Sequence, residues 1–158
     1  MFGLFKAKKQ VVVAPSDGSL LPLDKVEDEV FSNRLAGDGL AIIPSSNTFV
    51  APVAGVVSKI FSTNHAFAIT TTNGLEVLVH IGLDTVSLQG EGFKRLAEEG
   101  QTVTVGQPII SADLEFLKLS GKDIVTPIVV NAQKEPSIVT DSIHIVREGE
   151  RIMEVTLK

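Results

Sequence analysis

Short apolar runs recur about every ten residues and are the strongest constraint on the fold of this chain. Many of their residues are β-branched, and Gly, Pro, Asn, Asp and Ser separate one run from the next. Examples are VVVAP, LAIIP, HAFAIT, LEVLVHIGL, TVTVGQPII and DIVTPIVV. Runs of this length between turn residues are typical of strands joined by tight connections. The pattern predicts an all-β fold, a mostly antiparallel β-sandwich or barrel.

Two stretches have helical features instead. Residues 91–99 place Phe93, Leu96 and Ala97 on one face and end at Gly100, which is a favourable helix C-cap. Residues 113–119 open with Asp113 as an N-cap and stop before Gly121. The sequence therefore predicts one or two short peripheral helices.

Length and charge limit the possible organisation and partners. A chain of 158 residues is expected to form a single domain, here over residues 11–158. Residues 1–10 combine apolar and basic side chains and predict a flexible amphipathic tail that could contact a membrane. No run has the roughly 18 apolar residues of a membrane span, so a cytoplasmic protein is expected. The net charge of −5 argues against nucleic acid and favours a basic protein partner. Because cysteine is absent, no thiol chemistry originates in this chain.

A histidine interrupts one of the most apolar runs, EVLVHIGLDT. The odd positions from Leu75 to Leu83 are all apolar and should face the core. His80 then lies on the other side, together with Glu76 and Asp84. The alternation therefore disfavours the alternative that His80 is a satisfied core histidine.

The preceding run adds a second histidine through an expected hairpin. Asn-Gly at 73–74 between two strand-like runs predicts a two-residue turn, so that Phe67 faces His80 and His65 faces Gly82. The histidines would then be diagonal neighbours on one face, about 7–8 Å apart. Phe67, Ile69 and Leu78 would form an apolar contact surface on that face, unless a second layer of the fold covers them. A three-residue turn would place the two histidines on opposite faces.

Two adjacent imidazoles allow three kinds of chemistry. One can act as a nucleophile while the other stabilises charge, which suits phosphoryl transfer. The pair can bind a metal, with Asp84 completing a set of two histidines and one carboxylate. One imidazole can also act as a general base for hydrolysis. For a nucleophilic His80, the Gly82 carbonyl is the expected partner of the other ring nitrogen. His144, in SIHIV, is interpreted as a strand residue without a special role.

Longer blocks resemble a known family. GLEVLVHIGLDTV, GEGFKRLAEEGQTVTVGQPI, FSTNHAF and VFSNRLAGDGLAI are similar, in order, to the glucose-type enzyme IIA of the bacterial phosphoenolpyruvate-dependent sugar phosphotransferase system. The resemblance covers residues 11–158 and implies an antiparallel β-sandwich that relays phosphate. It implies that His80 accepts a phosphoryl group from the histidine-containing phosphocarrier protein. It further implies transfer to a cysteine on the IIB domain of a sugar transporter of glucose type.

The resemblance also implies roles for residues around His80. His65 would be the second active-site histidine, needed for onward transfer, and Thr63 would orient it. Asp28 and Asp84 would meet a basic residue of the phosphocarrier. Phe31, Phe61 and Leu78 would contribute to an apolar docking surface.

Cofactors, further partners and departures are also part of this expectation. No cofactor is required, although zinc could bridge His65 and His80 together with a carboxylate of a partner, and regulatory targets are possible. Leu78 stands where relatives can carry Phe, and Glu27-Asp28-Glu29 replaces a less acidic stretch, so partner affinity could differ. Two other classes stay open as alternatives: a metallohydrolase and a swinging-arm carrier of biotinyl or lipoyl type. The carrier would need a lysine at a hairpin tip, where this chain has Asn73-Gly74.

Overall fold

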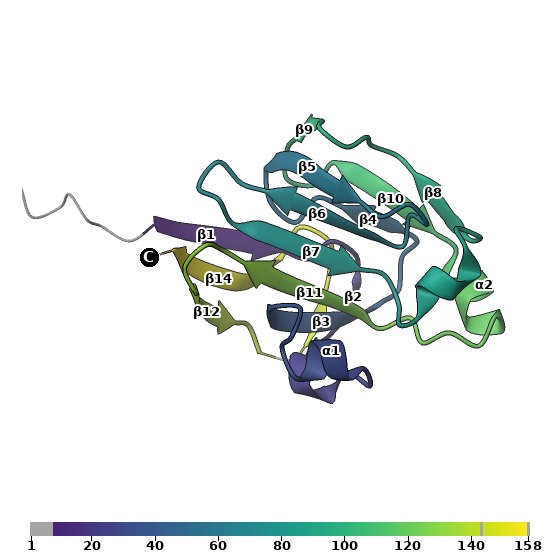
Figure 1. Cartoon of the computed structure of the whole chain (residues 1–158). Coiled ribbons are helices and arrows are strands. Elements are labelled where there is room, and N and C mark those ends of the chain that lie inside the picture. The colour runs from purple at the N-terminus through teal and green to yellow at the C-terminus, as the bar shows by residue number, and fades with distance from the viewer. Residues whose placement is uncertain (1–7, 143, 158) are drawn as a thin grey trace, which may run out of the picture.

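The part of the protein that the structure describes forms three antiparallel sheets, which Figure 1 shows. The structure is a computed structural model that describes residues 8–142 and 144–157. The predicted all-β fold with short helices is confirmed. Within the described residues, no helix combines the length and the apolarity that crossing a bilayer would require.

The largest sheet has eight strands in the order β13-β2-β3-β11-β7-β6-β5-β9. Each neighbouring pair is antiparallel. Its strands in chain order are β2 (Gly18–Pro22), β3 (Asp38–Pro44), β5 (Gly55–Ile60), β6 (Ala66–Thr70), β7 (Glu76–His80), β9 (Thr102–Val103), β11 (Thr126–Asn131) and β13 (Ile145–Val146).

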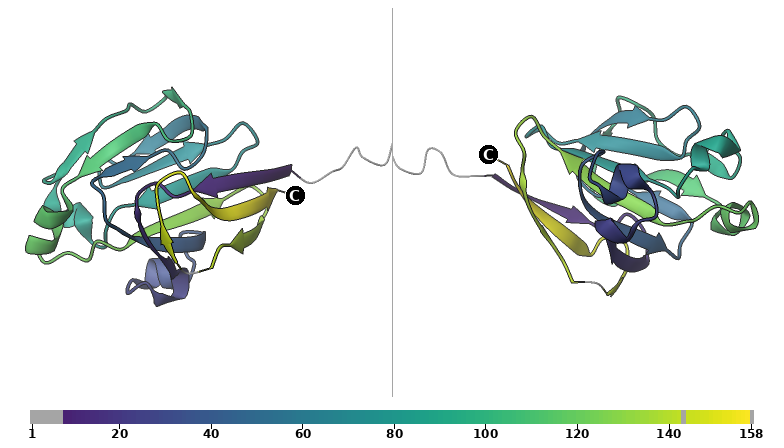
Figure 2. Two further views of the ribbon diagram at one scale, coloured as in Figure 1. Left: turned by 180° about the vertical axis from the view of Figure 1, so that it is seen from behind. Right: turned by 60° about the horizontal axis from the view of Figure 1, so that its bottom comes forward.

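Two three-stranded sheets pack against the large sheet and enclose the main core (Figures 1 and 2). One contains β1 (Lys8–Val13), β14 (Arg151–Leu157) and β12 (Ser137–Thr140); the other contains β4 (Thr48–Val50), β10 (Pro108–Ala112) and β8 (Phe93–Arg95). All three sheets contribute to one buried apolar cluster, for example through Met153, Ile110 and Val79. Because β1 begins at Lys8, the expected domain boundary at residue 11 falls inside a strand. The rest of the predicted tail, residues 1–7, lies outside the described residues.

A second, smaller apolar cluster covers the opposite face of the large sheet. The short elements η2 (Leu23–Lys25) and α1 (Glu29–Ser32) supply Leu23 and Phe31, which pack on Ala41 of β3 and Val129 of β11. Asp28 caps α1 by accepting from the Val30 backbone N–H at 2.9 Å. The right view of Figure 2 shows α1, in dark blue, lying over this face. His80 lies at the margin of this cluster.

One of the two predicted helices is wrong. Helix α2 (Leu114–Leu119) is present and Asp113 caps it through a bond from the Phe116 N–H, as predicted. Residues 91–99 form no helix: Phe93–Arg95 is strand β8, and a 3-10 turn, η3 (Thr85–Leu88), precedes it. Gln89, Gly90 and Gly92 all have positive φ, which is incompatible with a helix start, and β8 pairs with β10 instead.

The predicted register of the β6–β7 hairpin is also wrong, by one residue. Ala66 pairs with His80, and Phe67 pairs with Val79. The cause is a three-residue loop: the Thr71 N–H bonds the Leu75 carbonyl at 2.8 Å, and Gly74 has a φ of 87°. The odd positions of β7 do face the core and His80 does lie on the other side, as predicted. Phe67 and Ile69, however, are fully buried in the core and do not form an outward surface.

Candidate active site

His80 ends strand β7 on the face turned away from the main core. Its side chain is partly exposed, and its ring lies 4.9 Å from the ring of Phe31, centroid to centroid. Its Nδ1 is 2.8 Å from the carbonyl oxygen of Gly82. Because a carbonyl can only accept, Nδ1 donates, and the neutral ring therefore carries its lone pair on Nε2. This is the partner that the sequence predicted for a nucleophilic His80.

The turn after β7 holds the Gly82 carbonyl in place. Gly82 has a φ of 78°, and a Cβ there would lie 2.6 Å from Cγ2 of Thr85 and 3.0 Å from the Asp123 carbonyl oxygen. The buried Thr85 hydroxyl donates to the Ile81 carbonyl at 2.7 Å, and the Leu83 N–H donates to the Asp123 carbonyl at 2.9 Å. Position 82 therefore needs glycine for its backbone angle and for the close approach of its neighbours.

His65 reaches His80 by a route that differs from the predicted hairpin face. In the observed register a regular strand would place His65 on the same face as Phe67, in the core. The chain is not a regular strand there: β6 begins only at Ala66, and residues 61–65 form a tight turn. The Phe61 N–H bonds the Ala66 carbonyl at 3.0 Å, and Asn64 has a left-handed φ of 58°. The histidines are close because the strand breaks before His65.

Within this turn, His65 is almost completely enclosed. It is 3 % exposed, and its ring lies 5.3 Å from that of Phe61 and 4.9 Å from that of His80, nearly perpendicular to both. Its Nδ1 is 2.5 Å from the Thr63 hydroxyl oxygen. Its carbonyl accepts from the Ile81 N–H at 2.8 Å, which joins the turn to the end of β7. Thr63, which was expected to orient His65, therefore contacts Nδ1 of its ring.

Both imidazoles are held neutral. Burial and, to a lesser extent, the neighbouring His80 together lower the pKa of His65 to about 4. Burial also lowers the pKa of His80, although the Gly82 carbonyl and the negative charge of Asp28 oppose the effect. A neutral imidazole keeps one ring nitrogen available as a nucleophile or ligand. Near pH 7 the pair can therefore supply one nucleophilic nitrogen and one N–H donor.

The acidic residues predicted for the site form no hydrogen bond to the histidines among the described residues. Asp28 caps α1 and acts on His80 through its charge. Asp84 is exposed and pairs with Lys122 at 3.1 Å. In the part of the chain that the structure describes, no three His, Cys, Asp or Glu side chains form a metal-binding group. A metal at His65 and His80 would need further ligands from another molecule.

The apolar residues predicted to surround the site fall into two groups. Phe31 and Phe61 contact the two histidine rings, and the partly exposed Leu78 borders the second cluster. Phe67 is 0 % exposed, because the register turns it into the core, so it is unavailable to a partner. The sequence did not reveal two residues near the site. Asn64 has a left-handed φ where the chain turns, and Arg95 donates a hydrogen bond to the Asn64 side chain. The Asn before His65 was a possible signal, since Asn is enriched in left-handed positions.

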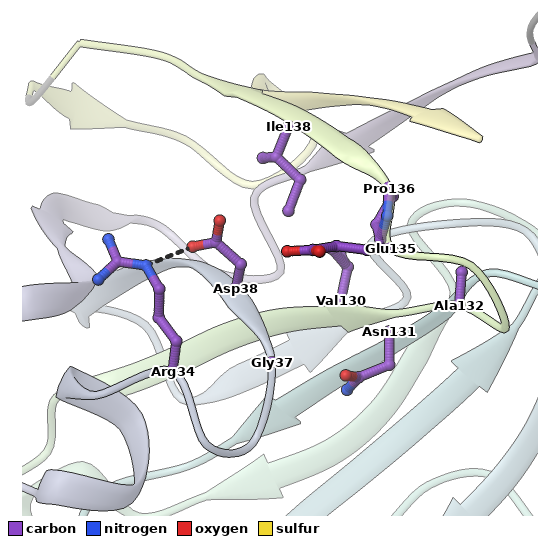
Figure 3. Close-up of a pocket in the computed structure, with 9 residues that line it drawn as sticks. All are labelled: Arg34, Gly37, Asp38, Val130, Asn131, Ala132, Glu135, Pro136 and Ile138. Carbon is purple, nitrogen blue, oxygen red and sulfur yellow. Dashed lines mark hydrogen bonds and ion pairs between the residues drawn. The ribbon is translucent and has the colours of Figure 1, made fainter. Parts of the chain in front are cut away.

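One pocket of the structure lies away from the two histidines. It has a volume of about 300 Å³ and opens between the end of α1 and the loop after β11, as Figure 3 shows. Arg34, Asp38 and Glu135 line it, and Arg34 Nε donates to Asp38 at 2.8 Å. Neither histidine lines this pocket. His80 is partly exposed, whereas His65 is buried beside it.

Comparison with known proteins yields a consistent group. Residues 10–135 match the model of the family described as phosphoenolpyruvate-dependent sugar phosphotransferase system, EIIA 1. The N-acetylglucosamine-specific EIICBA component of Klebsiella pneumoniae is 49 % identical over 118 residues, which are 75 % of this chain. The chain spans only 18 % of the length of that relative.

Two relatives are matched over most of their length. The glucose-specific EIIA component of Buchnera aphidicola subsp. Acyrthosiphon pisum is 46 % identical over 127 residues, covering 80 % of this chain and 79 % of that protein. The structure of glucose permease IIA from Mycoplasma capricolum superposes with a TM-score of 0.87 at 41 % identity. That superposition covers 93 % of this chain and 96 % of the other. Sequence and fold therefore point to one family.

Proposed function

Because the chain belongs to the EIIA 1 family of the phosphoenolpyruvate-dependent sugar phosphotransferase system, we propose that His80 carries the phosphoryl group in this relay. Members of this family are phosphotransferases that relay phosphoryl groups in the sugar phosphotransferase system. The observation that supports His80 is its tautomer. The Gly82 carbonyl occupies Nδ1 and leaves the Nε2 lone pair for an incoming phosphoryl group.

The first transfer is an in-line displacement at phosphorus. His80 Nε2 forms a new N–P bond while the N–P bond to the donor histidine breaks, and the donor ring keeps that electron pair. As the ring acquires positive charge, the hydrogen bond from Nδ1 to the Gly82 carbonyl becomes charge-assisted and stronger. A ring fixed in one orientation avoids the loss of rotamer freedom at the moment of transfer.

His65 supports the second transfer. When the Thr63 hydroxyl donates to Nδ1 of His65, the proton of that ring resides on Nε2 and can be donated to a phosphoryl oxygen. The depressed pKa of His65 means that it does this as a neutral donor, without a second positive charge beside the phosphorylated ring. A cysteine thiolate of a IIB domain then forms an S–P bond as the N–P bond at His80 breaks.

The partners proposed are the histidine-containing phosphocarrier protein and the IIB domain of a sugar transporter of glucose type. Asp28 supplies negative charge near His80 for a basic partner, and the exposed Asp84, which pairs with Lys122 in the free protein, is proposed to contact the same partner. The partly exposed Phe61 and Leu78 supply apolar contact, whereas Phe31 is buried against the ring of His80. The protein is proposed to act in the cytoplasm, and its phosphoryl transfer to need no cofactor. Zinc at the two histidines would require a carboxylate from a partner.

Phosphorylation by phosphoenolpyruvate and the two general phosphotransferase proteins, followed by mapping of the labelled residue, tests this function. We expect the wild-type protein to be labelled at His80 and His80→Gln to accept no phosphate. His65→Gln should accept phosphate but fail to deliver it to a IIB domain. Label at His144, which is exposed and lies just before β13, would overturn the assignment.

A further inference from the structure

The contact between the two histidines depends on the backbone of Asn64. Phe67 and Ile69 face the core, and His65 would continue that series in a regular strand, away from His80. Asn64 prevents this by adopting a left-handed φ of 58°, with its N–H bonded to the Phe61 carbonyl at 2.7 Å. Side-chain direction at position 65 is therefore set by the conformation of position 64.

A residue from another sheet holds the side chain of Asn64. Arg95 Nε donates to Asn64 Oδ1 at 3.0 Å, and its Nη1 lies 3.7 Å from Glu98. Arg95 itself is anchored in β8, where it pairs with Ile110 of β10. The bond therefore joins the three-stranded sheet β4-β10-β8 to the turn that carries His65.

The other contacts of His65 cannot replace this bond. Thr63 and Phe61 belong to the same turn, so they would move with it. The bond from the Ile81 N–H fixes only the carbonyl side of His65. Over residues 8–142 and 144–157, the Arg95–Asn64 bond is the single side-chain hydrogen bond that ties the 61–65 turn to a different element.

We propose that Arg95 is a positioning residue for His65: by holding Asn64, it directs the His65 imidazole at His80 and at the phosphoryl group bound there. Arg95 touches neither ring, so its effect is indirect. The consequence for phosphoryl delivery rests on the proposed function. The effect on the imidazoles of the free protein does not.

Nuclear magnetic resonance of the free, full-length protein tests the positioning directly. In Arg95→Gln and in Asn64→Gly, which keeps the left-handed backbone but lacks the acceptor, the His65 ring should loosen. We expect its pKa to rise from about 4 towards the ordinary value, and the ¹⁵N signals of both rings to shift. Asn64→Asp, which retains an acceptor and tolerates this φ, should resemble wild type. The matched control is Arg151→Gln. It removes the arginine of β14 that pairs with Asp141, in a sheet that does not contain Arg95.

The double variant Arg95→Gln/Asn64→Gly separates one shared bond from two independent effects. If both substitutions remove the same bond, the double variant should perturb His65 no more than either single one. In the relay, acceptance at His80 should stay within about twofold of wild type. Delivery to a IIB domain should fall by about tenfold or more, because misplacement of a catalytic group by about 1 Å costs up to 10²-fold.

The outcomes are distinct. Unchanged His65 signals in both single variants, or additive changes in the double variant, overturn the positioning role of Arg95 whatever the relay does. Shifted His65 signals with normal delivery overturn the role of His65 in delivery, while labelling at His80 tests the acceptor separately.

Discussion

The two histidines of the site are held in different ways. His80 lies at the end of a regular strand, and the peptide carbonyl of Gly82 orients its ring. His65 lies in an irregular turn, where the Thr63 hydroxyl contacts its ring and Arg95 holds the residue before it. His80 is thus positioned by backbone, and His65 by side chains. The difference suggests that His80 resists surface substitutions that would displace His65.

The largest loss of stability is expected from a substitution in the turn that orients His80. In Gly82→Ala, the new Cβ would meet Thr85 and the Asp123 carbonyl at a positive φ. Left-handed strain costs about 1–2 kcal/mol and overpacking about 1–3 kcal/mol, so the free energy of unfolding should fall by about 2–5 kcal/mol. Chemical denaturation measures this.

A matched substitution separates strain from a general intolerance of alanine. Gly74 also has a positive φ, but in Gly74→Ala the new Cβ would meet no atom within 4 Å. It should lose only the strain component, about 1–2 kcal/mol. Equal losses in the two variants would contradict the close approach of Thr85 and Asp123 to Gly82.

The side-chain-held histidine should make stability depend on pH. The folded pKa of His65 is about 4 and its unfolded value about 6.5, so the unfolded chain binds more protons between these values. The stabilisation from a neutral His65 is complete above about pH 6.5 and is lost as the pH falls towards 4, by about 3 kcal/mol.

The measurement is the difference in unfolding free energy between wild type and His65→Gln at several pH values. Gln cannot titrate, so groups that titrate alike in both proteins cancel. The difference should change by about 3 kcal/mol between pH 7 and pH 4. A pH-independent difference would mean that the His65 ring titrates normally in the folded protein.

The same contrast explains what could be predicted from the sequence. The alternation from Leu75 to Leu83 placed His80 correctly outside the core, because a strand with one buried face reveals its orientation through period two. The Gly82 carbonyl followed from its position two residues later. The resemblance to glucose-type enzyme IIA was confirmed by the family match.

The proximity of His65 was predicted for the wrong reason. Asn-Gly favours a two-residue turn, but the Thr71–Leu75 bond closes a three-residue loop, which turned Phe67 into the core. In the structure the chain turns at the left-handed Asn64, whose side chain accepts from Arg95, 31 residues away in the chain. Local pattern carries no information on such a tertiary bond. The helix expected over 91–99 failed similarly, because pairing of β8 with β10 overrode its helical spacing.

A smaller effect is expected from the hydroxyl that contacts His65. Thr63→Val keeps the shape of the side chain but removes the hydrogen bond at Nδ1. The loss of a hydrogen bond of this kind costs about 1 kcal/mol in unfolding free energy. The main readout is the tautomer of His65 by ¹⁵N resonance: without Thr63 we expect a mixture, whereas Thr63→Ser should preserve the wild-type signals. If the His65 tautomer is identical in the Thr63→Val and Thr63→Ser variants, Thr63 does not determine the tautomer of His65.

The smallest effect tests whether charge near His80 contributes to holding it. Lys122→Met removes the ammonium group that pairs with Asp84 beside the turn that contains Gly82. Because Asp84 is mostly exposed, the pair should contribute less than about 1 kcal/mol to stability, and 1 M salt should abolish its contribution. If backbone alone positions His80, its ¹⁵N signals should not change in Lys122→Met at low salt, although the unfolding midpoint shifts slightly. A displaced His80 signal would mean that this ring, like His65, depends on a distant side chain, and the contrast between the two histidines would then be one of degree.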